Sequence, residues 1–495
     1  MIAVGLNTQG HDCGAALLRE TDGELHITAI AEARLDRVPH SAAWPRRALD
    51  YCLAAAGLGE LRQADCVGTD ADFDHLDCHA ASAWYLSGFE DAAVLVLDAG
   101  QGLYHGQGTA LKALERRRVA DTARYFAKVT EKCGFDAFGA GKTMALYGFA
   151  EGFARRDPIG IPAERFDGLR IDYGAAFGRL DALAGFDPAL HPQGLIDEPW
   201  VNLAREAQEA FFEDVLHLAR MARQKTGSRH LCLAGGAFLS CIANRRLLDS
   251  GLVDDIFIQP AASDEGIALG AALLAYYRAG GQLRLPRLRT AMFGHRPAEP
   301  PMAEFVRARQ LRAHPATVQE VAALLADGRV VARFAGASEF GPRALGNRSI
   351  LADPRRPGMA RHINEQVKHR EVFRPFAPSV LAEAAGGIFD LPVDSPFMLL
   401  AARPRPEWRD RIPAVLHVDG SSRLQTVHRQ QSPDYYALIE AFGALTGVPL
   451  LLNTSFNDAG EPIVESREDA LASFCRTGID DLYLDGWLVE KPAAV

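Results

Sequence analysis

Asp74-His75-Leu76-Asp77-Cys78-His79-Ala80-Ala81-Ser82-Ala83 is the stretch on which our interpretation of this chain depends. The run is predicted to be helical, and a helix places His75 and His79 one turn apart on the same face. Two imidazoles at this separation can bind one metal ion. With 15 histidines in 495 residues, the pair is also compatible with two ordinary helix residues. The metal-site interpretation therefore depends on whether other ligands converge on this helix.

The composition indicates a multidomain globular protein, because 48% of the 495 residues are hydrophobic. A net charge of -10 argues against nucleic-acid and anionic-membrane partners. The eight cysteines include no C-x-x-C pair, which favours reduced thiols in a cytoplasmic protein. The N-terminus lacks the pattern of a signal peptide, and no apolar run reaches the roughly 18 residues of a membrane span. We therefore expect a cytoplasmic protein.

A polar turn separates two short apolar runs at the N-terminus, residues 2–6 and 15–18. This pattern predicts a hairpin, and a first hairpin with a donor-rich turn grips phosphate in actin- and hexokinase-like folds. His11 and Asp12 lie in the turn. They are candidates for a general base and its orienting acid, or they are turn residues.

Two predicted strands lead into carboxylates. The strand at 92–97 ends on Asp98, and the strand at 255–259 is followed by Asp264 before a helix at 267–277. Carboxylates at the carboxyl ends of parallel strands commonly face the site in α/β proteins. Both acids are candidate partners for the histidine pair, although helix capping is the commoner role for an acid such as Asp264.

Paired glycines follow another predicted strand, at 230–234. Gly235 and Gly236 precede a helix at 238–250 that contains Asn244. Glycines let a nucleotide approach the backbone, and a helix N-terminus favours its negative charge. This segment therefore predicts nucleotide binding.

Gly139-Ala140-Gly141-Lys142-Thr143 resembles a phosphate loop only superficially. The full pattern requires glycine at position 136, where Asp136 stands, and no strand precedes the segment. We predict a glycine-rich turn before a helix at 142–154, with Lys142 lining a site. Loops are expected at 155–200 and one long helix at 201–225.

Glycine, arginine and proline are frequent between residues 280 and 301, which indicates a linker. We expect domains at 1–290 and 316–495, with the linker at 291–315. In the second domain, Arg343 and Arg348 lie in a glycine-rich loop and are either phosphate ligands or solvated surface residues.

Four more polar side chains of the C-terminal part form a candidate triphosphate cradle. Alternation along extended segments would put two cations on one side and two short polar side chains on another. These residues are Lys368 with Arg370, and Ser455 with Asn457.

A series of ungapped blocks extends over nearly the whole chain. They are His11-Asp12 with Ala15-Ala16-Leu17, Glu32-x-Arg34, His75-x-x-x-His79-Ala-Ala-Ser-Ala, Asp98, Leu233-Ala234-Gly235-Gly236, Gln259-Pro260-Ala261-Ala262-x-Asp264, Glu339 to Ser349, Phe373-Arg374-Pro375-Phe376-Ala377-Pro378-Ser379 and Leu452-Asn453-Thr454-Ser455-Phe456-Asn457. Together they resemble the O-carbamoyltransferase family, which includes nodulation-factor, cephamycin and tobramycin carbamoyltransferases.

The resemblance implies an α/β protein with two catalytic domains. The N-terminal domain would be actin/hexokinase-like and similar to proteins that transfer threonylcarbamoyl to tRNA. The C-terminal domain would be similar to threonylcarbamoyl-adenylate synthases. It would use ATP and carbamoyl phosphate, with Mg²⁺ as a compatible ion, to form carbamoyl adenylate, and the N-terminal domain would transfer the carbamoyl group to a hydroxyl of a small molecule. A homodimer is compatible with this expectation.

The resemblance also implies roles for individual residues. It makes His75, His79, Asp98 and Asp264 the ligands of a divalent metal, which is iron in relatives. It makes His11 the general base for the acceptor hydroxyl. Nucleotide contacts are implied for a larger set: Gly235 and Gly236, the K-x-R pair Lys368 and Arg370, the S-x-N pair Ser455 and Asn457, and less directly Arg343 and Arg348.

The chain departs from the family pattern in two places. Where relatives often have Asn after G-G-x-x-L, it has Ser240, and where they often carry N-E-G-E-G-K, it has Ala137-Phe138-Gly139-Ala140-Gly141-Lys142. Both acids are missing, which is compatible with a less charged acceptor, and the chain also looks short for the family between about 105 and 200. Two alternatives stay open from sequence: a threonylcarbamoyl-type fusion that modifies tRNA, and a non-catalytic nucleotide-binding regulator.

Overall fold

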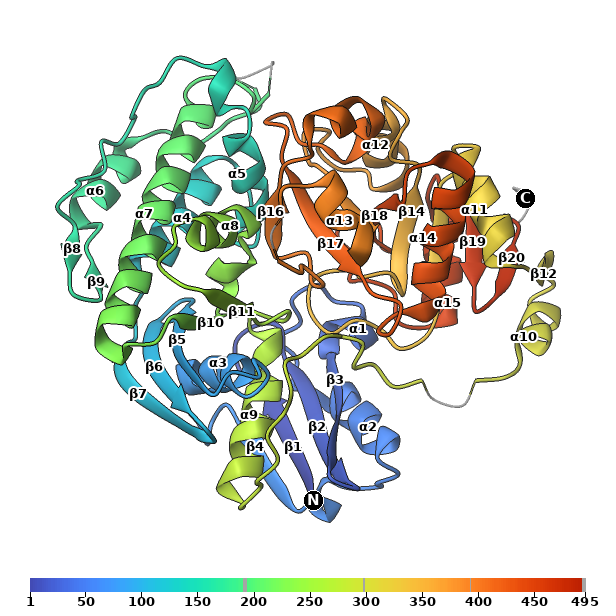
Figure 1. Cartoon of the computed structure of the whole chain (residues 1–495), viewed down its shortest axis with the longest axis horizontal. Helices are drawn as coiled ribbons and strands as arrows, with labels where there is room; N and C mark the ends of the chain where they lie inside the picture. Colours follow the sequence, from blue (N-terminus) through green and yellow to red (C-terminus); the bar gives the residue numbers. More distant parts are fainter. Residues whose placement is uncertain (190–193, 297–298, 392, 492–495) are drawn as a thin grey trace.

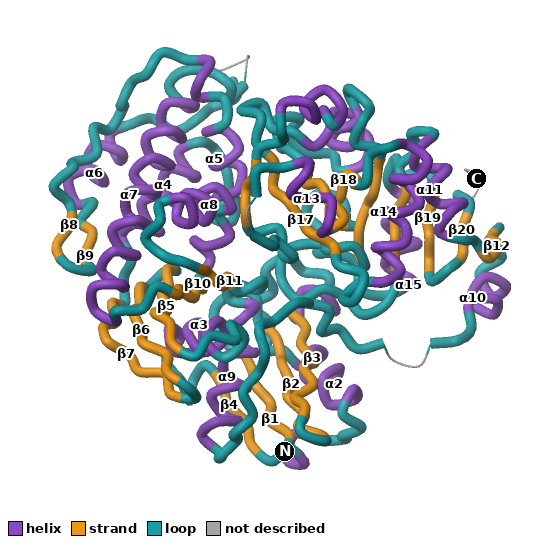
Figure 2. The backbone as a smooth tube through the Cα atoms, viewed as in Figure 1, coloured by secondary structure: helices purple, strands orange, loops and turns teal. Residues whose placement is uncertain are grey.

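The computed structural model describes residues 1–189, 194–296, 299–391 and 393–491 and contains three large β-sheets with helices on their faces (Figure 1). This arrangement confirms the predicted α/β class. Two of the large sheets lie in the N-terminal half of the chain and the third in the C-terminal half (Figure 2). None of the described helices combines the length and apolarity needed to cross a bilayer.

The first sheet grows from the predicted N-terminal hairpin. Strands β1 (Ile2–Asn7), β2 (Gly14–Thr21) and β3 (Glu24–Ala31) are antiparallel neighbours, and β4 (Cys66–Thr69) pairs with β1 in parallel. Five of the six residues of β1 are buried. Helix α2 (Arg46–Ala55) packs its apolar residues against one face of this sheet, and the short helix α1 (Glu32–Asp36) precedes it. The predicted hairpin is confirmed.

The second sheet repeats this connectivity. Strands β5 (Asp91–Leu97), β6 (Gln101–Gln107) and β7 (Ala110–Arg117) form an antiparallel meander, to which β10 (His230–Ala234) and β11 (Asp255–Ile258) add in parallel. Each sheet is a three-stranded meander extended by parallel pairing, with one added strand in the first sheet and two in the second. This is the arrangement expected for an actin/hexokinase-like N-terminal part.

Two helices lie between these sheets. Helix α3 (His75–Trp84) packs on β5 and β10, whereas α9 (Glu265–Arg278) packs on β1, β2 and β4. The two helices meet at Gly270, where an added Cβ would stand 1.9 Å from the carbonyl oxygen of Cys78. An added Cβ at Gly5 would likewise stand 2.0 Å from the carbonyl oxygen of Ala268. Strand β1, α9 and α3 are therefore in direct backbone contact.

The other face of the second sheet is covered by α7 (Trp200–Thr226), with α4 (Asp121–Lys132) and α5 (Ala140–Tyr147) beside it. Helix α7 confirms the predicted long helix. Helix α5 is shorter than the predicted helix at 142–154, because the chain turns at Gly148, whose backbone lies against the imidazole of His417. The remaining elements of this half are β8 (Phe166–Asp167), β9 (Arg170–Ile171), α6 (Gly174–Ala182) and α8 (Cys241–Asp249).

The third sheet has nine strands in the order β12-β20-β19-β13-β14-β18-β15-β17-β16. Their bounds are β12 (Ala313–Pro315), β13 (Val331–Phe334), β14 (Arg348–Ala352), β15 (Ala377–Leu381), β16 (Leu400–Ala402), β17 (Ser422–Val427), β18 (Leu450–Ser455), β19 (Asp481–Leu484) and β20 (Trp487–Val489). Its helices are α10 (Met302–Ala308), α11 (Val318–Ala326), α12 (Met359–His362), α13 (Ala382–Ile388), α14 (Pro433–Thr446) and α15 (Arg467–Arg476).

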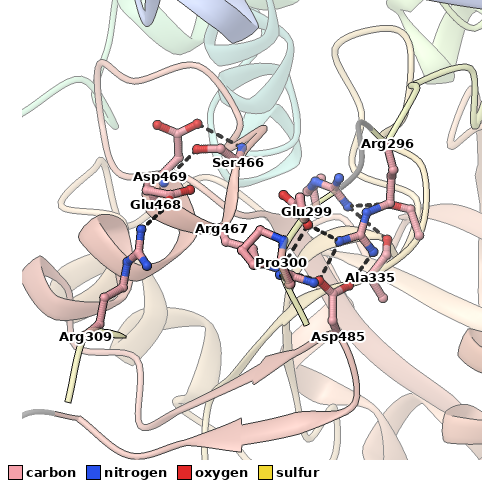
Figure 3. Close-up of polar contacts among 12 residues, drawn as sticks. Arg296, Glu299, Pro300, Arg309, Ala335, Ser466, Arg467, Glu468, Asp469 and Asp485 are labelled. Atoms are coloured by element: carbon pink, nitrogen blue, oxygen red, sulfur yellow. Dashed lines mark hydrogen bonds and ion pairs between the residues drawn. The ribbon is translucent and has the colours of Figure 1, made fainter. Parts of the chain in front are cut away.

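The segment that joins the two halves is anchored by ion pairs (Figure 3). Arg296 contacts Asp485 and Glu299 at 2.6 Å, and Arg467 contacts the same two carboxylates at 2.8 and 3.0 Å. The predicted linker at 291–315 is wrong at its C-terminal end, since α10 and β12 lie within it and β12 pairs with β20 of the third sheet. The division into two domains stays a prediction.

The halves share an apolar core, because one cluster of buried residues runs from the second sheet into the third. Their backbones also touch, since a Cβ added at Gly341 would stand 2.9 Å from the carbonyl oxygen of Pro260. Asn244 donates a hydrogen bond of 3.0 Å to the Leu399 carbonyl across the same junction. The loops that carry the candidate site residues are therefore held against each other.

Replacing Gly270 with alanine should destabilise the protein by about 1–3 kcal/mol, because the new methyl group would force α9 away from the backbone of α3. A lower urea midpoint would show this. Gly178→Ala in α6 is the matched control, since nothing lies within 4 Å of a Cβ there and alanine favours helix. Equal midpoints for the two variants would contradict the close contact.

Candidate functional site

The predicted histidine pair lies at the start of α3 and faces the start of α9. Nε2 of His79 is 3.3 Å, and Nε2 of His75 is 3.6 Å, from the same Oδ1 atom of Asp264. The two rings are 4.8 Å apart between centroids. Asp264 occupies the N-cap position of α9, but its side chain makes no capping hydrogen bond. The carboxylate is instead directed at the histidines.

Asp98 completes this cluster from the end of β5. One carboxylate oxygen accepts a 2.5 Å hydrogen bond from the backbone N–H of Gly236, and the other accepts one of 2.7 Å from Ala99. Gly235 has a φ of +96°, and a Cβ there would stand 2.2 Å from the Leu97 carbonyl oxygen. Gly236 thus holds the Asp98 carboxylate in place, and Gly235 adopts the backbone conformation that the turn requires.

One ligand atom from each of His75, His79, Asp98 and Asp264 lies within 4.8 Å of the others. Nε2 of both histidines and Oδ1 of Asp264 are buried, and apart from their ion-pair contacts with one another they have no hydrogen-bond partner among the described residues. Buried polar atoms that lack hydrogen bonds are costly. Two imidazoles and two carboxylates suit a divalent transition metal, so the cluster has the composition and spacing to hold one.

His11 and Asp12 adjoin the cluster. Nδ1 of His11 is 2.9 Å from Asp12, and its Nε2 is 3.5 Å from Asp264. The hydrogen bond with Asp12 and the charges of Asp264 and Asp98 outweigh burial and raise the pKa of His11 to about 9. Burial acts to raise the pKa of Asp12, but hydrogen bonds with His11 and His40 lower it to about 2. An ionised carboxylate therefore orients an imidazole of increased basicity.

His40 also binds Asp12, with 2.9 Å between its Nδ1 and Oδ1. It stands 28 positions from Asp12, and no local pattern in the sequence connects the two. His40 could therefore not be identified as a site residue from the sequence. The side chains of His11, His40 and His75 are each about two-fifths exposed, so this side of the cluster is open to solvent.

A second site lies at the junction of the two halves. It is a cavity of about 240 Å³ between α5 and α8 on one side and the third sheet on the other. Four arginines line it: Arg343, Arg370, Arg374 and Arg423. Gly141, Cys241, Ser455 and the pair His417 and Asp419 complete much of the wall.

Two of these arginines have a partner outside the cavity, since Arg374 pairs with Glu371 and Arg370 donates to Asn364, but the positive charge of the cavity is not fully compensated. Burial, followed by the charge of Arg423, lowers the pKa of Arg343 to about 9, and burial with the charge of Arg374 lowers the pKa of Arg370 to about 9. Within the described part of the chain, Nε of Arg343 and of Arg423 has no hydrogen-bond partner. Buried like charges of this kind favour a polyanionic ligand, because guanidinium groups bind phosphate oxygens in pairs.

The predicted cradle residues do gather beside this cavity. Nζ of Lys368 donates to the Ser455 carbonyl at 2.8 Å and to Asn457 Oδ1 at 2.6 Å. Lys368 does not line the cavity, whereas Arg370 and Ser455 do. The extended segment predicted around Lys368 is wrong, because a helical turn (Ile363–Val367) ends directly before it.

Other predicted residues have different surroundings. Arg348 does not reach the cavity; it donates to the carbonyls of Ala335 and Gly336 and stacks on a phenyl ring. Asn244 is buried between the halves, as described above. Lys142 forms a 3.0 Å ion pair with Glu371 across the junction, next to Gly141 of the cavity wall.

Two of the four cavity arginines are absent from the sequence prediction. Arg374 lies within one of the ungapped blocks, so a signal was present. Arg423 is a single cation within β17 and has no pattern around it. The loop that carries Arg343 touches the loop that leads to Asp264, since a Cβ added at Gly341 would stand 2.9 Å from the carbonyl oxygen of Pro260. The two sites therefore adjoin.

Comparison with known proteins gives two matching family models. Residues 322–491 match the carbamoyltransferase C-terminus and residues 197–273 match the carbamoyltransferase N-terminus. Nodulation protein NolNO of Sinorhizobium fredii is 36% identical over 99% of this chain and 80% of its own length. An uncharacterised Synechocystis protein is 32% identical over 99% and 97%, and nodulation protein NolO of Bradyrhizobium diazoefficiens is 37% identical over 85% and 79%. The chain belongs to the carbamoyltransferase family and is a transferase of carbamoyl groups.

Proposed function

We propose that this carbamoyltransferase uses ATP and carbamoyl phosphate to carbamoylate a hydroxyl group of a small natural product in the cytoplasm. In the first half-reaction, carbamoyl phosphate, ATP and one water molecule give carbamoyl adenylate, phosphate and pyrophosphate. In the second, the acceptor hydroxyl attacks the carbamoyl carbon and AMP leaves. The observation that carries this proposal is the cavity lined by four arginines, of which Arg343 and Arg423 keep a buried Nε without a hydrogen-bond partner; this cavity adjoins the cluster of histidines and aspartates.

The cavity supplies what adenylate formation requires. ATP and carbamoyl phosphate are polyanions. Their negative charge offsets the mutual repulsion of the guanidinium groups of Arg343, Arg370 and Arg423. Lys368 holds the Ser455 and Asn457 backbone in place through hydrogen bonds to both carbonyls. The hydroxyl of Ser455 is thereby fixed at the cavity wall.

The cluster of histidines and aspartates supplies what transfer of the carbamoyl group requires. The raised pKa keeps His11 protonated near neutral pH, and only the neutral imidazole can act as a base. A divalent cation held by His75, His79, Asp98 and Asp264 would offset the charges of Asp264 and Asp98, which contribute to that rise beside the hydrogen bond with Asp12, and would stabilise the phosphate of the departing AMP. Neutral His11 accepts the proton of the acceptor hydroxyl at Nε2, while Asp12 fixes the ring through Nδ1. The family resemblance implies that this cation is iron.

Incubation with ATP and carbamoyl phosphate should give carbamoyl-phosphate-dependent exchange of pyrophosphate into ATP. Replacing His75 with alanine should reduce carbamoyl transfer by more than roughly 100-fold, because a cation ligand is lost, and should leave this exchange largely intact. Mass spectrometry of candidate acceptors measures transfer. His314→Ala, on an exposed histidine far along the chain, is the control. Equal loss of both half-reactions in His75→Ala would contradict the assignment of adenylate formation to the cavity and of carbamoyl transfer to the cluster.

Arg423→Met should impair the formation of carbamoyl adenylate and not the transfer of the carbamoyl group. Removing one buried guanidinium loses a charge-assisted contact of about 1.5–3 kcal/mol, which corresponds to a rise of roughly 10- to 150-fold in the KM for ATP. Because it also relieves repulsion with Arg343 and Arg374, the ligand-free variant should melt at or above the wild-type temperature. A drop in melting temperature with unchanged KM would assign Arg423 to structure alone.

Metal content gives a readout that does not depend on activity. Protein purified without oxygen should contain close to one divalent metal ion per chain, and elemental mass spectrometry would identify iron if the resemblance holds. His79→Ala should lose most of it, since His79 is a fully buried ligand, whereas His314→Ala should retain it. Retention of metal by His79→Ala would contradict the assignment of this cluster.

A further inference from the structure

The wall of the arginine cavity contains a histidine and an aspartate that the steps above do not use. His417 and Asp419 stand on a tight turn before β17, in which Gly420 donates to the His417 carbonyl and His417 donates to the Ser421 carbonyl through their backbone N–H groups. Both side chains line the cavity. The His417 ring lies against the backbone of Gly148, since a Cβ added there would stand 2.0 Å from its Cε1 atom. The imidazole is therefore held in one place.

The two nitrogens of this imidazole have different surroundings. Nδ1 of His417 is 3.6 Å from Oδ1 of Asp419. Burial acts to raise the pKa of Asp419, but the contact with His417 and hydrogen bonds from Ser421 lower it to about 2. An ionised carboxylate on this side favours the tautomer that carries its proton on Nδ1. Nε2 then keeps its lone pair, and although this atom is buried, nothing in the described part of the chain hydrogen-bonds to it.

Few other groups of this cavity are able to accept a proton. Guanidinium groups only donate hydrogen bonds. Burial raises the pKa of the Cys241 thiol and that of the Tyr147 hydroxyl, so both groups keep their protons near neutral pH. The Asp419 carboxylate is a weak base and is already engaged by Ser421. Among the described residues of the cavity wall, His417 is thus the remaining proton acceptor.

Water has a route to this imidazole. A larger cavity of about 510 Å³ adjoins the arginine cavity, and Gly148, Asp419 and Ser421 line both. Charged side chains of both signs, such as Glu151 and Arg403, line the larger cavity, and a polar space of this size holds water. The first half-reaction consumes one water molecule, which must lose a proton. The cavity wall therefore needs a base on the side from which water enters.

We propose that His417 is the general base that activates the water of the first half-reaction and that Asp419 positions its ring. This inference rests on the proposed function and assigns the group that starts it. The water oxygen bonds to the carbonyl carbon of carbamoyl phosphate while Nε2 of His417 takes one water proton. The bond from that carbon to the bridging oxygen breaks, and phosphate leaves with the electron pair and the second water proton. The product is carbamate, whose oxygen bonds to the α-phosphorus of ATP, and pyrophosphate leaves with the electron pair of the bond that breaks there.

Supplying carbamate directly separates a base from a structural residue. Exchange of labelled pyrophosphate into ATP is measured on the full chain with carbamoyl phosphate and, separately, with ammonium carbamate, which enters after the water step. His417→Gln should lower the exchange with carbamoyl phosphate by roughly 100-fold or more, because glutamine is not basic, and should leave the exchange with carbamate unchanged. Asp419→Asn should also lower only the first exchange, because an amide that donates to Nδ1 puts the imidazole proton on Nε2.

His314→Gln, at an exposed histidine, is the matched control and should change neither exchange. An unchanged exchange with carbamoyl phosphate in His417→Gln would overturn the base and leave the proposed function. Equal loss with both carbamoyl donors would assign His417 to the shape of the cavity and would also overturn the base. A wild-type chain that exchanges pyrophosphate with neither carbamoyl donor would contradict the proposed function, and the base with it.

Discussion

The candidate transfer site depends on one close contact, the crossing of α3 and α9 at Gly270. Because no side chain separates the helices there, the backbone of α9 reaches the Cys78 carbonyl. The start of α9 is then near enough to α3 for a single carboxylate, Asp264, to face two imidazoles. A side chain at position 270 would separate these ligands. The packing between the two N-terminal sheets therefore also sets the distances between the side chains of the cluster.

Electrostatics divides the molecule into two adjoining sites of opposite character. The cluster at α3 and α9 concentrates carboxylates and imidazoles, whereas the junction cavity concentrates guanidinium groups whose pKa values are lowered by burial and mutual repulsion. In the cluster, the imidazoles of His75 and His79 already face the carboxylate of Asp264. The cavity is unfavourable by itself, since like charges are held together away from water, and a polyanion would offset them. The contact between Gly341 and Pro260 keeps both near one edge of the N-terminal part.

Short, strongly patterned segments predicted the fold well. The N-terminal hairpin, the βα units around Asp98 and Asp264 and the long helix α7 follow from apolar runs with clear turn or helix signals. Strands β6 and β7 do not, because β6 contains two glycines and β7 is partly exposed along its length. The histidine and aspartate cluster could be predicted from the sequence, because its aspartates follow strands whose ends converge. His40 and Arg423 could not be predicted, because tertiary packing alone brings them to their sites.

The position of Arg348 shows why motif membership does not fix a role. It shares a glycine-rich loop with Arg343, yet its guanidinium donates to the carbonyls of Ala335 and Gly336 and lies over the ring of Phe334. Both arginines keep a buried Nε without a hydrogen-bond partner, but only Arg343 lines the cavity. Two identical side chains in one block therefore differ in whether a ligand in the cavity can reach their guanidinium group. That difference is a property of packing and not of the local sequence.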